Sequence, residues 1–430
     1  MSEVTKKSQA IFSEKSHPLD MSSKARTFDI AVIGGGIAGK ACALGLAQLG
    51  FQTIQIAPGL DQSTPLPQGT TWGQRIYAFS PSTQKLLAHL QIWDALDHSR
   101  MQAVQDMRIF GDRGEQNDQL HLSSFEAGTT QLAWIGESSL IEHTLDQAAK
   151  FQNKLERLSD SATTIHTDES GAILTLKNTP SIHALLVVAA DGANSPIRSK
   201  IGIEASEESY GQNAVVANWL CSNSHLETAY QWFLSGGDIL AMLPLPNKQV
   251  SMVWSTSPDN AAKLMTADQS TWTEIFSKIA HGALFEKLGH LTLNSAPASF
   301  PLNKIRAERF IGPEINPKVA LVGDAAHVMH PLAGQGLNLG LRDVAVLLKV
   351  LKQREAFRIP SDPVLLRRYE RQRQGDTSSL LWVTDNLKKL FSGTNPAELF
   401  LRNFGLGLVN RSHFIKRQLI ERALGEIDFE

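Results

Sequence analysis

The chain has 430 residues, of which 42% are hydrophobic and 20% are charged, and its formal net charge is −2. This is the composition of an ordinary globular protein, and the small net charge excludes a protein built to wrap nucleic acid. The length predicts two packed domains. The two cysteines, Cys42 and Cys221, exclude a disulfide framework, fit a reducing compartment and are expected to be buried apolar side chains.

The first 26 residues are polar and are expected to form a disordered tail. They lack both the apolar core of a signal peptide and the arginine-rich face of a transit peptide. Met21 begins the stretch MSSKARTFDIAVIGGG and looks like a second translation start, so residues 1–20 are interpreted as an N-terminal extension. No stretch of the sequence is long and apolar enough to span a bilayer, and a cytoplasmic protein is expected.

A strand, a turn and a helix are predicted between residues 28 and 50. An apolar run precedes the turn GGGIAG, and a helix with apolar residues at helical spacing follows it. In this context G-x-G-x-x-G predicts dinucleotide binding, with a plain glycine-rich turn as the alternative. The glycines permit the tight turn, the approach of a pyrophosphate and close packing of helix on strand, and amides at the helix start hold phosphates. The expected contacts are Gly34, Gly36, Ile37, Ala38 and Gly39.

The second strand, Thr53–Ile56, lacks the acid that usually follows such a strand and binds the ribose hydroxyls. Ala57 and Pro58 stand there instead, and the nearest acid is Asp61. Three alternatives stay open: Asp61 binds the ribose in place of the missing acid, a backbone group does so, or the adenosine is bound more weakly.

A second buried strand ends in the sequence ADGANSPIR, residues 190–198. Asp191 and the glycine after it predict a turn. Ser195 and Pro196 fit the N-cap and the first position of a helix, which leaves Arg198 one turn further on and able to point back at the same loop. The capped helix alone does not explain the Asp-Gly pair or the arginine.

Residues 215–257 contain four strand-like runs, VVANWL, AYQWFL, ILAMLPL and VSMVWS, whose alternation predicts an antiparallel sheet over a binding site. A large apolar ligand would need part of this sheet to line a cavity. Most of its large apolar side chains are expected to be core and some to face the ligand: Trp219, Trp232, Phe233, Met242, Leu243, Pro244 and Trp254.

The most informative stretch is GDAAHVMHPLAGQGLNLGLRD, from Gly323 to Asp343, which follows an apolar run. Asp324 ends this third strand, where its carboxylate suits the hydroxyls of a sugar-like chain. Pro331 stiffens the loop. A helix is predicted from Leu337 to about Gln353, and its N-terminal amides and dipole stabilise negative charge on a ligand above the loop.

Two histidines, His327 and His330, lie in this loop near Asp324. Because the sequence offers no further ligand cluster, a metal site is not expected. A structural or loop-orienting role is favoured for each histidine, and an acid-base role is the alternative. No residue is assigned as the catalytic base.

The C-terminal stretch LFLRNFGLGLVNRSHFIKRQLIERALG mixes apolar residues with five basic ones, Arg402, Arg411, Lys416, Arg417 and Arg422. A final helix packed on its own domain is favoured over a basic amphipathic surface that touches a membrane or a partner.

Three motifs, GGGIAG, ADGANSPIR and GDAAHVMHPLAGQGLNLGLRD, resemble in order and spacing those of the class A flavoprotein monooxygenases. Within that class the chain is most similar to the ubiquinone-biosynthesis hydroxylases. This resemblance rests on QRIYAFSPSTQKLLAHLQIWDAL, ILAMLPLPNKQVSMVWST, SFPL and HPLAGQGLNLGLRDVAVL, and runs from about Phe28 to Gly425.

The resemblance implies an α/β fold, with a Rossmann-like FAD-binding domain of the p-hydroxybenzoate-hydroxylase type and an antiparallel β-sheet substrate domain. It divides the chain into a tail (1–26), a discontinuous FAD-binding domain (27–105, 132–205 and 305–375), a substrate-binding sheet domain (106–131 and 206–304) and a C-terminal helical region (376–430).

By motif match the resemblance also implies FAD contacts beyond the first turn. These are Arg75, Asp191, Gly323, Asp324, Pro331, Gly334, Gln335, Gly336, Leu337 and Asn338. Asp191 also belongs to a motif implicated in binding reduced nicotinamide. The Asp of the family's Asp-x-Arg segment is Gly73 here, and this departure, like that at Ala57, concerns the periphery of FAD.

The implied reaction uses NAD(P)H to reduce bound FAD and O2 to place one oxygen atom on the aromatic ring of a prenylated phenol in ubiquinone biosynthesis. The implied partners are this substrate, O2, other ubiquinone-biosynthesis proteins and, by peripheral contact, the inner face of the membrane; nucleic acid is not among them. The alternatives are a flavin monooxygenase of a small soluble aromatic compound, a flavin reductase of isoprenoid chains, and a non-catalytic subunit that binds FAD or lipid.

Overall fold

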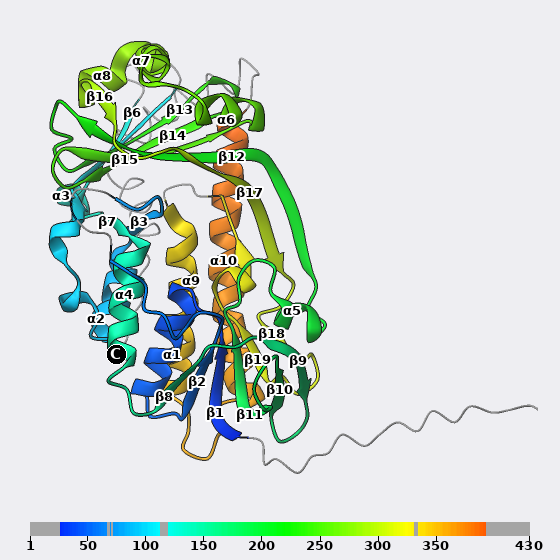
Figure 1. The fold of residues 1–430 in the computed structure, drawn as a ribbon. Coiled ribbons are helices and arrows are strands. Elements are labelled where there is room, and N and C mark those ends of the chain that lie inside the picture. The colour runs from blue at the N-terminus through cyan, green and yellow to red at the C-terminus, as the bar shows by residue number, and fades with distance from the viewer. Residues whose placement is uncertain (1–25, 67–68, 70–71, 112–118, 331–333, 393–430) are drawn as a thin grey trace, which may run out of the picture.

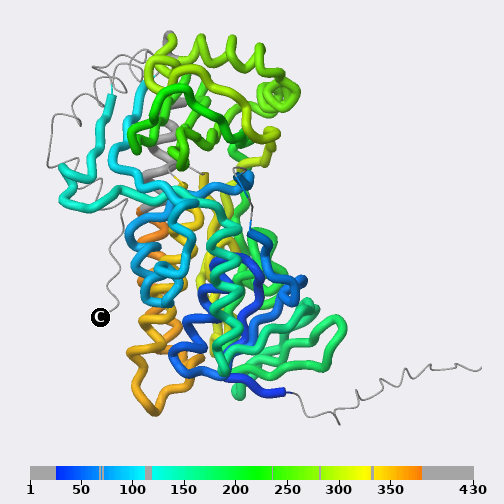
Figure 2. The backbone as a smooth tube through the Cα atoms, turned by 60° about the vertical axis from the view of Figure 1, so that its left-hand side comes forward, coloured from blue at the N-terminus to red at the C-terminus, as the bar shows by residue number. Residues whose placement is uncertain are grey.

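The computed structural model describes residues 26–392 except 67–68, 70–71, 112–118 and 331–333. The expected tail, apart from Arg26, and the basic C-terminal stretch therefore lie outside the described residues. Two large sheets lie at opposite ends of the molecule, and a long helix, α10 (Pro363–Ser392), runs from one toward the other (Figures 1 and 2).

The first sheet carries the three glycine-containing motifs. Its strand order is β18-β19-β11-β1-β2-β8, with β10 and β9 continuing from β11. β1 pairs in parallel with β2 and β11, and β19 pairs in parallel with β11, so the carboxyl ends of the motif strands meet at one edge. The strands are β1 Arg26–Ile33, β2 Thr53–Ile56, β8 Leu155–Leu158, β9 Ala162–Thr167, β10 Ala172–Leu176, β11 Ile182–Ala189, β18 Ile311–Gly312 and β19 Val319–Leu321.

The central strands of this sheet end in continuous apolar runs, because packed side chains cover both of their faces. Residues 30–33, 186–189 and 319–321 are all buried. Helices α1 and α9 pack against each other, and α4 and α10 flank this pair. The helices are α1 Ile37–Gln48, α2 Pro81–His89, α4 Ser138–Ala149, α5 Pro196–Lys200 and α9 Gln335–Lys352.

The second sheet is antiparallel apart from one parallel pair, β13 with β5. Its order is β20-β17-β12-β15-β14-β13-β5-β6, with β16 beside β12. The strands are β5 Asp106–Phe110, β6 Gln119–Ser123, β12 Ala205–Cys221, β13 Thr228–Phe233, β14 Ile239–Leu245, β15 Gln249–Thr256, β16 Leu291–Leu293, β17 Ala298–Ala307 and β20 His327–Val328. The predicted antiparallel sheet and the predicted fold class are confirmed.

Helices cover the outer face of the antiparallel sheet, as Figure 1 shows at its upper end. They are α6 Pro258–Met265, α7 Gln269–Lys278 and α8 Ala283–Leu288. Trp219 of the sheet packs edge-on against Trp272 of α7, and both are fully buried. These helices explain why one face of each strand is so rich in large apolar residues.

Smaller elements connect the two sheets. A three-stranded sheet of β3 (Ile76–Phe79), β7 (Ala133–Glu137) and β4 (Met101–Val104) lies between them with the short helix α3 (Ser124–Ala127). The long strand β12 pairs with the whole of β17 from Ala205 to Val216, with a register shift between Ser209 and Gln212.

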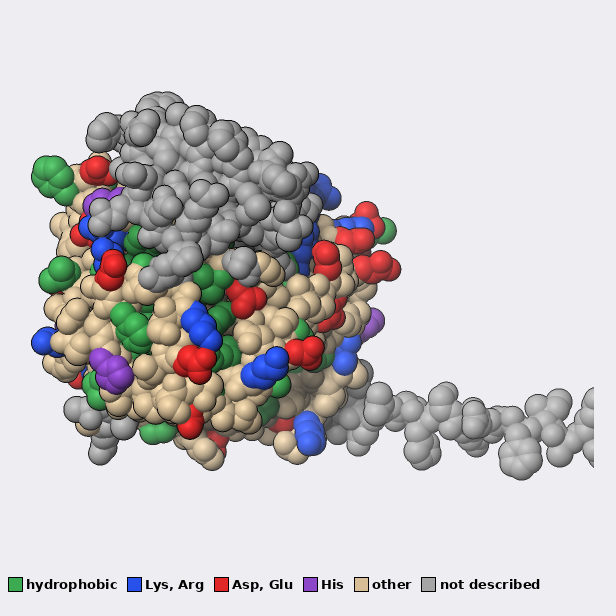
Figure 3. Space-filling view, turned by 90° about the horizontal axis from the view of Figure 1, so that it is seen from above, with side chains coloured by type: hydrophobic (Ala, Val, Ile, Leu, Met, Phe, Trp, Pro, Cys, Tyr) green, Lys and Arg blue, Asp and Glu red, His purple; other side chains and the backbone are tan. Residues whose placement is uncertain are grey.

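Both cysteines are buried, Cys42 in α1 and Cys221 in β12, and burial raises the pKa of each thiol to about 12. They behave as the small apolar side chains that the composition predicts. On the face seen in Figure 3, the described Lys, Arg, Asp and Glu side chains are interspersed. None of the described helices combines the length and the apolar character that crossing a bilayer requires.

Candidate active site

One large cavity of about 920 Å³ lies where the motif edge of the parallel sheet meets the inner face of the antiparallel sheet. Every predicted FAD contact within the described residues lines it, from Gly34 in the first turn to Asn338 in α9. Pro331 lies outside the described residues. The structure thus brings these positions together in space, while their contact with a cofactor stays a prediction.

The first turn leaves room for a phosphate group. Gly34 has φ +142°, and a Cβ there would collide with the carbonyl of Ala190, so this position needs glycine. A Cβ at Gly36 would meet nothing within 4 Å. Gly36 is also the N-cap of α1, and no side chain caps the helix. The amides of the first helical turn therefore face an open cradle, which fits a pyrophosphate.

The end of the cavity beside β2 is the predicted adenosine side; it has Ala57 in place of an acid, and Asp61 does not line the cavity. Asp160 lines it, but its carboxylate accepts hydrogen bonds from Ser161, Asn178 and Thr179. Glu142 of α4 also lines the cavity, and burial raises the pKa of its carboxyl. Sequence reasoning missed Glu142, because nothing in α4 marks it as different from any amphipathic helix.

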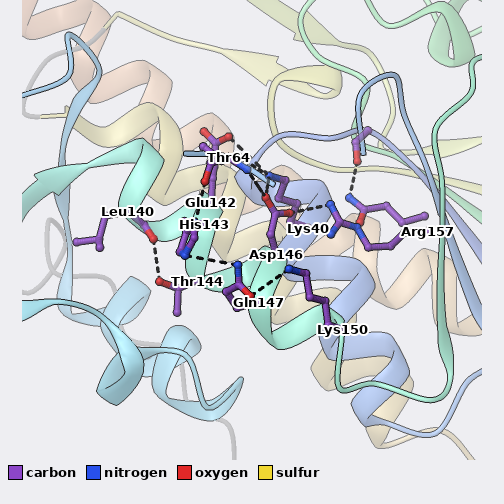
Figure 4. Close-up of polar contacts among 12 residues, drawn as sticks. Lys40, Thr64, Leu140, Glu142, His143, Thr144, Asp146, Gln147, Lys150 and Arg157 are labelled. Atoms are coloured by element: carbon purple, nitrogen blue, oxygen red, sulfur yellow. Dashed lines mark hydrogen bonds and ion pairs between the residues drawn. The ribbon is translucent and has the colours of Figure 1, made fainter. Parts of the chain in front are cut away.

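A buried ionic cluster stands behind this end of the cavity (Figure 4). Lys40 of α1 donates to Asp146 at 2.9 Å, and Arg157 of β8 donates to the same carboxylate at 2.7 Å. Lys40 also lies 3.7 Å from Glu142 and donates to Thr64. Burial alone would raise the pKa of Asp146, but its hydrogen bonds and the two cations bring it below the usual value. The cluster ties α1, α4, β8 and the loop after β2 together.

Gly73, which replaces the Asp of the family's Asp-x-Arg segment, has a glutamate beside it. The Gly73 amide donates to Glu137, a fully buried carboxylate that also pairs with Arg100. A Cβ at Gly73 would lie 3.2 Å from Glu137 Oε1. Glu137 thus fills the space beside this position, while Arg75 lines the cavity as the resemblance implies.

The second and third turns are joined to each other. Ser195 caps α5 and donates to Asp191, which also accepts from the amide of Ile197. Arg198 reaches across to the carbonyl of Ala325 at 2.9 Å. The predicted N-cap at Ser195 and the proline at the helix start are confirmed. Burial raises the pKa of Asp191.

The third turn depends on the carboxylate of Asp343, which is fully buried. It accepts from the Gly323 amide at 2.8 Å, lies 2.7 Å from Nε2 of His327 and accepts from Nε of Arg373 at 2.6 Å. Burial alone would raise its pKa, but His327 and Arg373 hold it below the usual value. This contact of His327 with Asp343 fits the loop-orienting role that was favoured for it.

Asp324 and the start of α9 form the rest of the cavity wall beside the third turn. Asp324 opens onto the cavity, and the surrounding protein raises the pKa of its carboxyl by desolvation. Helix α9 begins at Gln335, two residues before the predicted start, with Gly334 as its N-cap. Asn338 donates to the carbonyl of Ala78 and accepts from the amide of Ser80, so its side chain fastens α9 to the region of β3.

His330 packs edge-on against Tyr210 with ring centroids 5.0 Å apart. Within the residues that the structure describes, no three His, Cys, Asp or Glu side chains converge as a metal site.

The other half of the cavity is apolar. Its wall includes Met107, Leu122, Val216, Leu243, Val253 and Phe300. Of the seven large residues singled out from the sequence, only Leu243 lines the cavity. Trp219, Trp232, Met242 and Trp254 face the opposite side, where α6 to α8 cover them. Strand alternation sends the large residues to that packed core and the smaller ones to the cavity.

The comparisons with known proteins agree with this architecture. The model of the FAD binding domain family matches residues 27–379. The 3-demethoxyubiquinol 3-hydroxylase of Escherichia coli (strain K12) is 33% identical over 92% of this chain and 98% of its own length. The ubiquinone hydroxylase UbiL of Rhodospirillum rubrum is 31% identical over 94% of this chain and 91% of its own. The crystal structure of the p-nitrophenol 4-monooxygenase PnpA of Pseudomonas putida DLL-E4 has a TM-score of 0.71 at 17% identity and covers 94% of this chain and 100% of its own.

The family match and the relatives above 30% identity together define an FAD-dependent aromatic monooxygenase, and FAD is its cofactor. Within that class, the chain belongs to the family of the ubiquinone-biosynthesis hydroxylases. The resemblance seen in the three motifs is thereby confirmed.

Replacing Gly36 by alanine tests the phosphate cradle. Because the added Cβ would meet no protein atom, Gly36→Ala is expected to fold normally. The methyl group would occupy the cradle, so the dissociation constant of FAD should rise by about tenfold, or ~1.4 kcal/mol. Titration of the apoprotein with FAD, followed by flavin fluorescence, measures this. Gly34→Ala is the contrast, since it should lose folding stability; unchanged FAD affinity in Gly36→Ala would contradict the assignment.

Replacing Asp343 by asparagine tests the third turn. At pH 7 the free energy of unfolding should fall by about 3–5 kcal/mol, because the variant removes the buried anion that pairs with the buried guanidinium of Arg373. The folded pKa of Asp343 is lowered, so its contribution is present above the unfolded carboxyl pKa of about 4. It is lost as the pH falls through the folded pKa.

Urea unfolding at pH 7 and at a series of lower values measures this, and the gap between variant and wild type should narrow with acid. Asp376→Asn is the matched control. Asp376 pairs with the same Arg373 but is partly exposed, so this variant should lose less free energy of unfolding. A gap of constant size down to low pH would count against the charge argument.

Proposed function

We propose that the protein hydroxylates the aromatic ring of a prenylated phenol in ubiquinone biosynthesis, with NAD(P)H and O2 as co-substrates. The relatives named as ubiquinone hydroxylases support this substrate class. The observation that carries it is the continuity of one cavity from the glycine turns to an uncharged wall. In the described part of the chain, no Lys, Arg, Asp or Glu of the antiparallel sheet lines that wall.

The proposed division of labour follows the two sheets. Residues 27–105, 132–205 and 305–375 hold FAD, and residues 106–131 and 206–304 hold the substrate. Both β12 and β17 extend over the boundaries at 205 and 304, and α10 continues through 375 without a break. The two parts therefore share elements rather than a flexible linker.

Bound FAD supplies the redox chemistry with O2, and the chain supplies position and electrostatics. The N-termini of α1 and α9 direct amide groups into the cavity, and Arg75 adds a positive charge. Asp324, which lines the cavity, would bind the hydroxyls of the ribityl chain. The apolar wall excludes water from the ring that is to be hydroxylated.

A small soluble aromatic acid is the competing substrate. Such a substrate calls for a cation in the substrate wall to hold its carboxylate. Lys248, the basic residue that sequence reasoning offered, lies in the turn between β14 and β15 and does not line the cavity. The likeness to a p-nitrophenol monooxygenase concerns the fold alone.

The substrate proposal is tested by deleting the gene and identifying the accumulating quinone precursors by mass spectrometry. A prenylated intermediate that lacks one ring oxygen is expected. Purified holoenzyme given NAD(P)H, ¹⁸O2 and that intermediate should add one labelled oxygen to the ring. An unchanged quinone pool, together with turnover of a small aromatic acid, would contradict the prenylated substrate and favour the small acid.

We also propose peripheral contact with the membrane, since a prenylated substrate resides there. The basic stretch 399–425 is the proposed contact and lies outside the described residues. Neutralising Lys416 and Arg417 to glutamine should lower cofractionation with anionic vesicles, because each basic residue contributes about 1 kcal/mol near such a surface. Equal partition of variant and wild type would remove the proposal, and Lys177→Gln in the parallel-sheet region serves as the charge control.

A further inference from the structure

The apolar wall contains one side chain of a different kind, Gln231 in β13. Strand alternation sends Tyr230 and Trp232 to the outer core, where their rings stack, and Ala229 and Gln231 to the cavity. Two residues of the antiparallel sheet with hydrogen-bonding side chains, Tyr230 and Gln231, are among the described residues that line the cavity. The Tyr230 ring packs in the outer core against Trp232, which leaves Gln231 as the polar side chain on the cavity face of β13.

The surroundings of Gln231 give its carboxamide nothing to bind. Its neighbours across the strands are Ala241 and Ile109, and Ala241 in turn pairs with Val253. The residue is only 5% exposed. Within the described residues its carboxamide makes no hydrogen bond to the protein. A glutamine amide can donate two hydrogen bonds and accept two, and that of Gln231 is not among the fully enclosed polar groups, so it stays available to a ligand in the cavity.

We propose that the Gln231 carboxamide binds a hydroxyl group on the aromatic ring of the substrate and so fixes which ring carbon faces the flavin. This rests on the proposed function. A phenol hydroxyl can either donate to Oε1 or accept from Nε2, so the neutral amide suits it without burying a charge. The surrounding small side chains, Ala229 and Ala241, leave space for a ring next to the amide.

Gln231 is thus a specificity-determining residue. A wall made only of hydrocarbon would accept a prenylated ring in several rotations, since apolar contacts are not directional. One hydrogen bond at a fixed point on the wall removes that degeneracy.

The test compares two ligands and three proteins. The ligands are a short-chain prenylated phenol and its analogue with hydrogen in place of the ring hydroxyl. The proteins are the wild-type holoenzyme, Gln231→Met and Gln249→Met. Methionine keeps the volume of glutamine and removes its hydrogen bonds. Gln249 is the matched control: it is a buried glutamine of β15 in the same sheet, it accepts a hydrogen bond from Asn294, and it does not line the cavity.

Dissociation constants come from the change in flavin absorbance on ligand binding. Wild type should prefer the phenol by about fivefold to tenfold, the value of one neutral hydrogen bond. Gln231→Met should bind both ligands equally, by weakening the phenol alone, and should yield a wider mixture of hydroxylated positions. Gln249→Met should keep the wild-type preference even if its stability falls. Gln231→Leu repeats the test should the methionine variant fold poorly.

The outcomes separate the two proposals. A Gln231→Met protein that retains the full preference and a single product position overturns the role of Gln231. If wild type hydroxylates neither the phenol nor any prenylated relative, the proposed function itself fails. A wild type that turns over the phenol without preferring it to the analogue also overturns the inference, and leaves the proposed function standing.

Discussion

The geometry of the cofactor side depends on one buried carboxylate, that of Asp343. It stands on α9 and binds the amide of Gly323, the imidazole of His327 and the guanidinium of Arg373 on α10. These contacts fix the turn after β19 at both of its ends, and Arg198 fastens the same turn to the second motif. A carboxylate can do this because it accepts several hydrogen bonds at once, and a buried site keeps those bonds strong.

Local sequence patterns predicted most of this side. Each glycine motif stands directly between an apolar strand and a helix, so its position at the sheet edge follows from the parallel pairing of the strands. Strand alternation was less decisive in the antiparallel sheet. It separates two sets of residues but does not say which face is covered by helices, so it could not tell which of the large residues, such as Trp219 and Trp254, belong to the core that was favoured for most of them. The small residues that form the cavity wall, with Gln231 among them, carry no signal of their own.

The two missing acids show a further limit of reading motifs. Ala57 and Gly73 suggested a weakened FAD periphery, yet Glu142 lines the cavity and Glu137 fills the space beside Gly73. Both come from one segment, the end of β7 and the helix α4, which contains no recognisable motif. Their positions depend on how α4 packs on α1, and in particular on the buried ion pair of Asp146 with Lys40. Tertiary packing of this kind cannot be read from spacing along the chain.

The pairing of β1 with distant strands has a consequence for how the protein is made. Ile30 pairs with Leu186, and Val187 pairs with Val319, so the parallel sheet joins segments that are synthesised far apart in time. The strand that carries the phosphate turn, β1, soon has β2 as one neighbour, but its other neighbour, β11, is synthesised more than a hundred residues later, and β11 in turn waits for β19. Such non-local pairing makes folding slow and leaves apolar strand surface exposed meanwhile. The nascent chain is therefore a natural client for chaperones until β19 has emerged.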